Sequence, residues 1–473
     1  MEEKRKNTNK LAVISGAWYI VGNFLVKGMA FLTTPIFTRI MSKDEFGDYS
    51  NYLSWSGIVL IVLTMSIDTS LISAKFDYEK KLSQYTLSTL SLILLLSFLW
   101  LAVVNIFSVF FTELMGLSIA YINIILIYGF FYLCVNFFQN TERYLYRYKR
   151  AVAISLFLVF STSLLSVLLV LNMSNHVTAR VIGGVIPTII VGVIIFGYYI
   201  KKGQSVDFKT WPYALKICLP YIPHLLSLLL LCSVDRIMIT RFCGPAETAM
   251  YSVAFTCGHM ASLLFSSMNN AYAPWLGDKL NEKDYNAIRT TSIFYVSLSC
   301  FVMIPMMLFA PEILLLLGGV AYVEAKYVMI PIALGTMCQF VYTLYVNIEQ
   351  YHKNTVNMAF ASVISAIINY FLNLWFIPLY GYVAAGYTTF LSYFVLLLIH
   401  MSIVKKMGYG KCYHNYFNLG IIFAICFIFI GIYFLYSNNA YRFSVTILFV
   451  IIISLYSWRY KTKIYSLYKE LVK

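Results

Sequence analysis

The sequence has few charged residues and no polar stretch long enough to fold as a soluble domain. Charged residues make up 12% of the 473 residues, hydrophobic residues make up 60%, and the mean hydropathy is +0.76. Soluble domains carry about 25% charged residues. The longest internal polar connection runs from Lys201 to Lys216, far below the ~40 residues that an independent domain needs. The composition therefore excludes a soluble protein and predicts an all-α integral membrane protein.

The sequence also lacks the motifs of common enzymes and metal sites. It contains no P-loop, no G-x-S-x-G, no H-E-x-x-H and no pair of carboxylates with catalytic spacing. Its nine cysteines are odd in number and form no C-x-x-C pair, so neither a disulfide framework nor a zinc site is indicated. We therefore expect no catalytic activity, no cofactor and no bound metal.

Basic residues flank fourteen apolar segments. About 20 apolar residues are needed to cross ~30 Å of hydrocarbon. Segments of this kind cover residues 11–40, 46–72, 85–111, 119–140, 151–173, 179–200, 217–242, 249–276, 290–317, 326–350, 355–379, 382–404, 415–436 and 442–458. Of the 35 Lys and Arg residues, 27 lie on one side of these spans, 6 on the other, and Lys27 and Arg236 inside them. Because cytoplasmic loops accumulate Lys and Arg, both termini are predicted to be cytoplasmic. The net charge of +15 thus indicates contact with anionic membrane lipids, and nucleic acid is not an expected partner.

An internal repeat divides the chain. The pattern T-R-x5-E-x3-Y-S covers Thr38–Ser50 and, 202 residues later, Thr240–Ser252. Six spans separate the copies, so their orientation is the same, which predicts two pseudo-symmetric six-helix lobes around a central cavity. We assign residues 1–200 to the N-terminal lobe, residues 201–405 to the C-terminal lobe, and residues 406–473 to two additional spans with a basic cytoplasmic tail.

A polar stripe runs along the first predicted span. One face of this helix carries, by its spacing, Gly16, Asn23, Lys27 and Thr34. A charge near the bilayer centre costs at least ~2.5 kcal/mol, so Lys27 is expected to face protein or a water-filled cavity. Lys27 and Asn23 are therefore either substrate-binding residues or part of a structural seam between helices.

The seventh and eighth spans carry the other candidates. Asp235 and Arg236 are neighbours about 100° apart around the helix, so each is expected to have a separate partner. Arg236 is either a cation for the substrate or a side chain that snorkels to the outer surface. On the polar face of the eighth span, His259 is either a hydrogen-bonded core residue or a proton sensor. The candidate substrate-binding residues are Lys27, Arg236, Asn23, His259 and Asn270, and the candidate for ion coupling is Asp235.

Two segments of the chain resemble the paired signatures of polysaccharide-repeat flippases of the O-antigen and capsule type, within the superfamily of multidrug and oligosaccharidyl-lipid exporters. They are KGMAFLTTPIFTRIMSKDEFGDYS, from Lys27, and CSVDRIMITRFCGPAETAMYSVA, from Cys232. The resemblance implies two six-helix lobes around a cleft, in which Lys27 and Arg236 would be the cationic lining. Many such flippases have twelve spans, whereas fourteen are predicted here, as in peptidoglycan-precursor flippases.

The expected function is that of a flippase which moves an undecaprenyl-pyrophosphate-linked oligosaccharide from the cytoplasmic to the outer leaflet by alternating access. The expected partners are this lipid-linked oligosaccharide, anionic membrane lipids and glycan-assembly proteins. The expected location is the bacterial cytoplasmic membrane. The alternatives are a cation-coupled multidrug extruder of the same fold, a membrane glycosyltransferase or polymerase, and a scaffold for glycan assembly.

Overall fold

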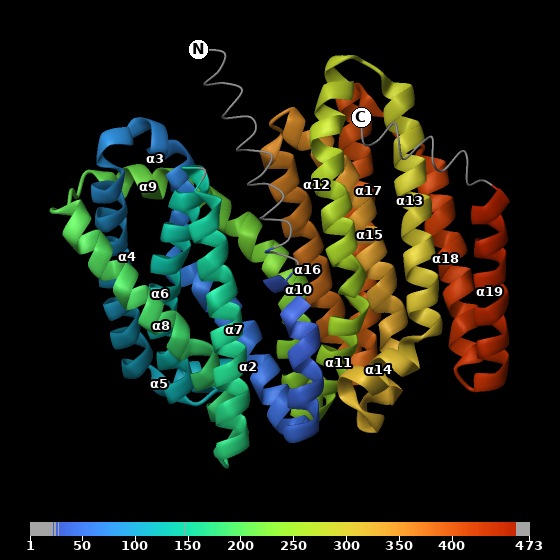
Figure 1. The fold of residues 1–473 in the computed structure, drawn as a ribbon, viewed down its shortest axis with the longest axis horizontal. Coiled ribbons are helices and arrows are strands. Elements are labelled where there is room, and N and C mark those ends of the chain that lie inside the picture. The colour runs from blue at the N-terminus through green and yellow to red at the C-terminus, as the bar shows by residue number, and fades with distance from the viewer. Residues whose placement is uncertain (1–21, 23–24, 27, 146, 460–473) are drawn as a thin grey trace.

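The computed structural model describes residues 22, 25–26, 28–145 and 147–459. The described residues are almost entirely helical, and none of them lies in a β-strand. Figure 1 shows two bundles of helices side by side, with α18 (Asn415–Leu435) and α19 (Asn439–Arg459) at the far edge of the second bundle. The predicted all-α architecture of two lobes and two C-terminal helices is confirmed.

The first lobe begins with a helix over residues 28–40. It continues with α2 (Lys43–Thr64), α3 (Leu71–Asp77), α4 (Leu82–Ile106), α5 (Ser108–Met115), α6 (Ile119–Tyr144), α7 (Tyr148–Asn172) and α8 (His176–Gly203). A capping box fixes the start of α2, because the Ser42 hydroxyl accepts the Glu45 N–H at 3.2 Å and the Glu45 carboxylate accepts the Ser42 N–H at 2.8 Å. The short α9 (Thr210–Cys218) lies across one end of this lobe and leads into the second.

The second lobe contains eight helices. They are α10 (Ile222–Cys243), α11 (Pro245–Gly258), α12 (Met260–Asn281), α13 (Tyr285–Leu308), α14 (Ala310–Gly318), α15 (Lys326–Tyr351), α16 (Thr355–Tyr380) and α17 (Tyr382–Val404). Two of these, α11 and α12, follow each other directly and break at His259. The break follows Gly258, where an added Cβ would lie 2.5 Å from Ile332 of α15.

Helix boundaries repeat between the lobes with the spacing of the sequence motif. Lys43 begins α2 and Pro245 begins α11, 202 residues later; Ser108 begins α5 and Ala310 begins α14, again 202 residues later. For α6 and α15, and for α7 and α16, the starting points are 207 residues apart, because the 3₁₀ segment Val320–Ala325 lengthens the connection in the second lobe. The structural repeat therefore follows the sequence repeat, and the exact domain boundaries stay a prediction.

The predicted count of fourteen spans is not confirmed. Ten helices of the described residues are long and apolar enough to cross a membrane, or eleven if the bent pair Lys43–Thr64 and Ile67–Asp77 is one span. Much of the first predicted span lies outside the described residues. The eighth is divided between α11 and α12, and the apolar part of the last helix that the structure describes is short, Asn439–Ile451. The difference thus arises from breaks in the helices and from the part of the first predicted span that lies outside the described residues.

The two lobes meet along α2, which packs against α10 and α11 (Figure 1). The repeated Thr-Arg pair adds direct bonds across this boundary. The Thr38 hydroxyl donates to the Leu317 carbonyl at 2.6 Å, and the Arg39 guanidinium donates to the Leu316 carbonyl at 3.0 Å. Both acceptors lie at the C-terminal end of α14, where carbonyls lack helical partners. The end of the first helix is thereby attached to the second lobe.

Candidate functional site

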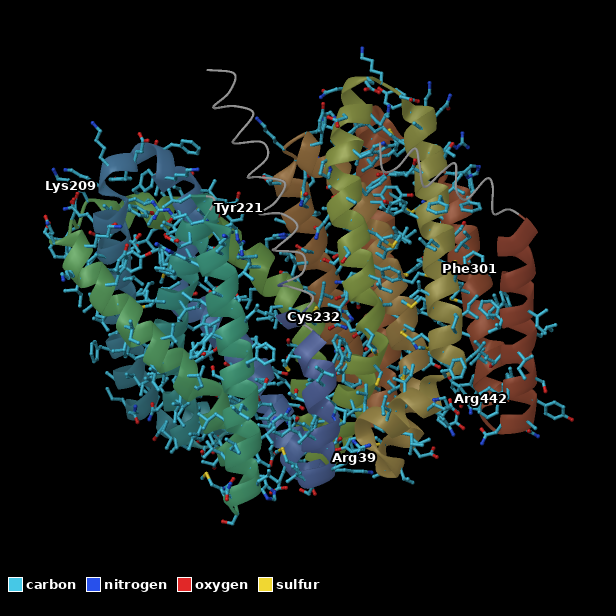
Figure 2. All side chains as sticks on the ribbon, viewed as in Figure 1. Arg39, Lys209, Tyr221, Cys232, Phe301 and Arg442 are labelled. Carbon is cyan, nitrogen blue, oxygen red and sulfur yellow. The ribbon has the colours of Figure 1, made fainter. Side chains whose placement is uncertain are left out.

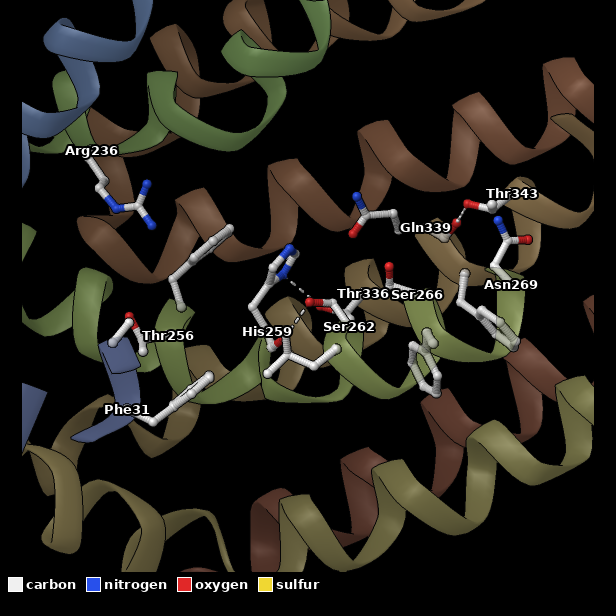
Figure 3. A pocket seen from close by; sticks show the side chains of 15 residues that line it. Phe31, Arg236, Thr256, His259, Ser262, Ser266, Asn269, Thr336, Gln339 and Thr343 are labelled. Carbon is white, nitrogen blue, oxygen red and sulfur yellow. Dashed lines mark hydrogen bonds between the residues drawn. The ribbon is translucent and has the colours of Figure 1, made fainter. Parts of the chain in front are cut away.

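A cavity of about 610 Å³ opens in the second lobe. Its wall combines aromatic rings with hydroxyl and amide groups from α11, α12 and α15, and the helix of residues 28–40 contributes Ala30 and Phe31. Figure 3 shows its polar residues, which include Arg236, Thr256, His259, Ser262, Ser266, Asn269, Thr336, Gln339 and Thr343. A concave site with many polar groups and one fixed cation is suited to a polar, anionic ligand.

Arg236 lies at one end of this cavity (Figure 3). Its guanidinium stands 4.4 Å from the centre of the Phe255 ring and donates to the Cys232 carbonyl at 3.0 Å. The side chain is half-buried, so the structure places it in the cavity wall, in contrast to the snorkelling interpretation. Its hydrogen bond to the Cys232 carbonyl uses one of its five N–H donors.

His259 lies further along the same wall (Figure 3). Its ring stacks on Phe255, with the centroids 4.7 Å apart, and its Nδ1 lies 3.3 Å from the Thr336 hydroxyl. These contacts agree with the interpretation of a hydrogen-bonded histidine. Because His259 also lines the cavity, a ligand there can contact its ring.

Asp235 is fully buried behind the cavity. Its carboxylate accepts hydrogen bonds from the Tyr251 hydroxyl at 2.5 Å, the Thr389 hydroxyl at 2.6 Å and the Asn373 amide at 2.7 Å. Asp235 and Arg236 therefore have separate partners, as their angular separation predicts. Because the three donors come from α11, α17 and α16, the carboxylate connects four helices of the second lobe. Three donors satisfy an ionised carboxylate.

A second cavity, of about 640 Å³, lies in the first lobe. Ala30 lines this cavity as well as the first, so the two adjoin along the helix of residues 28–40. Arg180 of α8 is its cation. The guanidinium lies 3.9 Å from the ring centres of both Phe37 and Tyr49. Among the described residues, no carboxylate forms an ion pair with it.

The other predicted site residues are not among the described residues that line the cavity. Lys27 and Asn23 lie outside the residues that the structure describes. Asn270 is exposed and is not among the residues that line the cavity, whereas its neighbour Asn269 is. Ser266, four residues before Asn270 on α12, does line the cavity, so Asn269 and not Asn270 continues the lining along this helix.

Arg180 is a candidate that sequence reasoning missed. The sequence analysis counts it only as one of six basic residues on the outer side of the spans. The signal that would have identified it is the aromatic set Phe37, Phe46 and Tyr49 in the first repeated motif. These rings lie close to the Arg180 guanidinium only after α8 packs against α2.

Comparison with solved structures supports the fold. The structure is similar to the lipid II flippase MurJ in an inward closed conformation, with a TM-score of 0.68 and 14% identity, over 94% of this chain and 99% of that one. It is also similar to an inward-facing multidrug resistance MATE family transporter of the MOP superfamily, with a TM-score of 0.61 and 12% identity, over 82% and 95% of the two chains. The likeness establishes a flippase-like and MATE-like fold.

Sequence comparison identifies the family. Two Haemophilus influenzae proteins, described as an uncharacterized membrane protein and as Lsg locus putative protein 1, are 23% and 22% identical to this chain. Each match covers 74% of this chain, and 86% and 87% of the respective relatives. Residues 220–375 match the MatE family, and residues 13–279, more than half of the chain, match the family described as polysaccharide biosynthesis protein. The chain therefore belongs to the polysaccharide biosynthesis protein family.

Proposed function

We propose that this protein is a flippase that moves an undecaprenyl-pyrophosphate-linked oligosaccharide from the cytoplasmic to the outer leaflet by alternating access. Family membership and the flippase-like fold support transport in polysaccharide biosynthesis. An O-antigen or capsule repeat unit is the cargo that such a pathway would supply. The polyprenyl tail can stay in the lipid while the polar head crosses between the lobes.

The observation that carries the proposal is the position of Arg236. It holds a fixed positive charge in the wall of a polar cavity, and none of the described residues that line either cavity is acidic. A pyrophosphate brings negative charges that need such a cation where water is scarce. Lys27 is proposed as the second cation, with Asn23 and His259 as further substrate contacts, and Asn269 takes the place of Asn270, which does not line the cavity.

Asp235 is proposed as the ion-coupling residue. Its carboxylate connects α10 with α11, α16 and α17 through three hydrogen bonds. A proton or a sodium ion that bound there would replace some of these bonds and change how the four helices pack. An ion gradient would thereby be linked to the movement of the second lobe against the first.

The proposed orientation places both termini in the cytoplasm of a bacterial cell, in the inner membrane. Figure 2 supports it, because Lys209 of a basic connection lies at the opposite end of the molecule from Arg39 and Arg442, which are assigned to the outer side. Reporter fusions test this topology. An alkaline phosphatase fusion that is active after Lys209 or after Lys473 would contradict it.

The function is tested with the full chain reconstituted in vesicles of Escherichia coli lipid. The probe is undecaprenyl-pyrophosphate-linked oligosaccharide extracted from the source strain, and the measurement is its accessibility to an external glycosidase. We expect wild-type protein to expose the glycan faster than empty vesicles, and Arg236→Ala to be slower than Arg241→Ala, an exposed arginine that serves as the matched control. Equal rates for wild-type and empty vesicles would contradict the proposal.

A multidrug extruder is the main alternative, because the MATE fold is shared. A cationic drug would favour acidic groups in its cavity, which the described lining residues do not provide. Export of ethidium from cells, lost in the Arg236→Ala variant, would favour this alternative. Synthesis of polymer by the purified protein would instead favour a polymerase.

A further inference from the structure

The two cavities differ in their chemistry, although they belong to repeated lobes. Phenylalanines supply the aromatic lining of the second-lobe cavity, namely Phe31, Phe255, Phe265 and Phe340. The lining of the first-lobe cavity contains four tyrosines, namely Tyr49, Tyr52, Tyr128 and Tyr132. We propose that the first-lobe cavity is the subsite for the sugars of the cargo, while the second-lobe cavity takes the pyrophosphate. This inference rests on the proposed function, and it assigns the sugars and the pyrophosphate of the cargo to different lobes.

One face of α6 forms the long wall of this subsite. Tyr128, Tyr132, Asn136 and Gln139 follow each other at spacings of four, four and three residues, so they share that face. The rings of Tyr128 and Tyr132 are 5.5 Å apart and tilted by 34°. A tyrosine ring packs against an apolar surface, and its hydroxyl can still donate a hydrogen bond to a polar group. A sugar presents both, with C–H groups on its faces and hydroxyls around its rim.

Two polar groups of the wall have no partner in the described protein. Tyr52 is 3% exposed, and its hydroxyl makes no hydrogen bond there. The amide of Asn136, which also lines the cavity, has no hydrogen bond to the described residues either. An unmade hydrogen bond of a buried polar group costs about 1–3 kcal/mol. This cost applies to the Tyr52 hydroxyl, whereas the Asn136 amide is only half-buried. A ligand rich in hydroxyls would supply partners to both groups.

Arg180 closes one end of the subsite. Its guanidinium is held between the Phe37 and Tyr49 rings, with a side-chain hydrogen bond to Tyr49 and a weak contact of 3.6 Å with the Met41 sulfur. The remaining N–H groups are available to sugar oxygens, in a geometry that the two rings fix in advance. The subsite thus offers rings along one wall and donors at its end.

The position of the subsite allows one cargo molecule to occupy both cavities. Ala30 lines each of them, so the two cavities adjoin at the helix of residues 28–40. Volumes of about 640 and 610 Å³ are within the range of small-molecule sites. A head group in which pyrophosphate and sugars are directly bonded would extend from one cavity into the next.

Native mass spectrometry of the purified full chain tests the assignment with two probes. One is undecaprenyl pyrophosphate, and the other is the undecaprenyl-pyrophosphate-linked oligosaccharide extracted from the source strain. We expect Tyr132→Ala and Asn136→Ala each to weaken binding of the glycan-bearing lipid about tenfold, and to leave binding of undecaprenyl pyrophosphate within about twofold of wild type. Arg236→Ala is expected to weaken both lipids. Tyr380→Ala is the matched control, since Tyr380 is 68% exposed outside the cavity.

Tyr52→Phe is a conservative variant that keeps the test valid if the alanine variants fail to fold. It removes one unpartnered hydroxyl and keeps the ring, so we expect unchanged thermal stability and about threefold weaker binding of the glycan-bearing lipid only. If the first-lobe variants bind both lipids as wild type does, or lose both equally, the sugar assignment is wrong. If wild-type protein binds neither lipid, the proposed function itself fails, and the two failures are thereby distinguished.

Discussion

A β-carbon added to Gly47 would lie 1.8 Å from the carbonyl oxygen of Pro245. The lobes therefore touch backbone to backbone, close to the point where both copies of the repeated motif begin their second helix. Small residues allow such close approach between helices in membranes. Lengthening the side chain here must push α2 away from α11 wherever this contact is formed.

We expect Gly47→Ala to reduce glycan export at least about tenfold, because the closed contact between α2 and α11 can no longer form. The measurement is surface glycan in cells that contain matched amounts of protein. Gly197→Ala is the control, since no atom lies within 4 Å of a β-carbon at that position of α8. Equal export by both variants would show that the contact has no part in the transport cycle.

The cationic lining is tested by Arg236→Ala and Lys27→Ala. Each is expected to abolish or strongly impair export while membrane insertion stays intact, because each removes a cation for the pyrophosphate. Arg236→Lys is expected to fall below wild type as well, since a lysine cannot reproduce the planar, ring-stacked contact. Near-normal surface glycan in both alanine variants, at matched protein levels, would overturn this assignment.

Asp235→Asn tests the coupling role. The amide keeps the shape but loses the charge, so we expect ion-dependent transport in vesicles to fall at least about tenfold and the response to a sodium or proton gradient to disappear. Stability should fall by about 1–3 kcal/mol, because all three buried donors lose a charged acceptor and the amide nitrogen cannot accept from at least one of them. Asp278→Asn changes an exposed carboxylate and is the control. A gradient response equal to wild type would remove Asp235 from the coupling mechanism.

The sequence predicts features that depend on spacing along one helix. The separate partners of Asp235 and Arg236 follow from their angular separation, and the repeated helix starts at Lys43 and Pro245 follow from the repeated motif. Features that depend on packing are not predictable in this way. Asn269 and not Asn270 lines the cavity, although both follow Ser266 on α12, and Arg180 becomes a site residue only through rings on other helices.

A buried contact between a carboxylate and a histidine illustrates the same limit. Glu349 of α15 and His400 of α17 are 0% and 2% exposed, and their Oε1 and Nδ1 atoms are 2.7 Å apart. The position of Glu349 near the end of a predicted span gives no sign of this burial. The two helices bring the groups together from places 51 residues apart in the chain, which no local pattern encodes.

Removal of one partner of this pair should destabilise the protein. We expect Glu349→Ala to cost about 3–5 kcal/mol, because it leaves His400 buried without its acceptor. Glu282→Ala removes an exposed pair with Lys279 and should cost less than about 1 kcal/mol. Thermal unfolding of the purified variants in detergent measures both. Similar losses for the two variants would mean that burial of the pair adds nothing to its contribution.

The last prediction concerns the movement of the lobes. If the two repeated turns close the outer side while the cavities face inward, a short crosslink between them should stop export. One cysteine replaces Ser42. The other is better placed at Ala246 than at Gly244, because Gly244 has a φ of 101° that a side chain disfavours. In a background without the nine native cysteines, we expect a short crosslink to form in cells and to block export until it is reduced, because an outer side held shut cannot release cargo. A crosslink that forms efficiently while export continues at the uncrosslinked rate would exclude rocking of the two lobes as the mechanism of this protein.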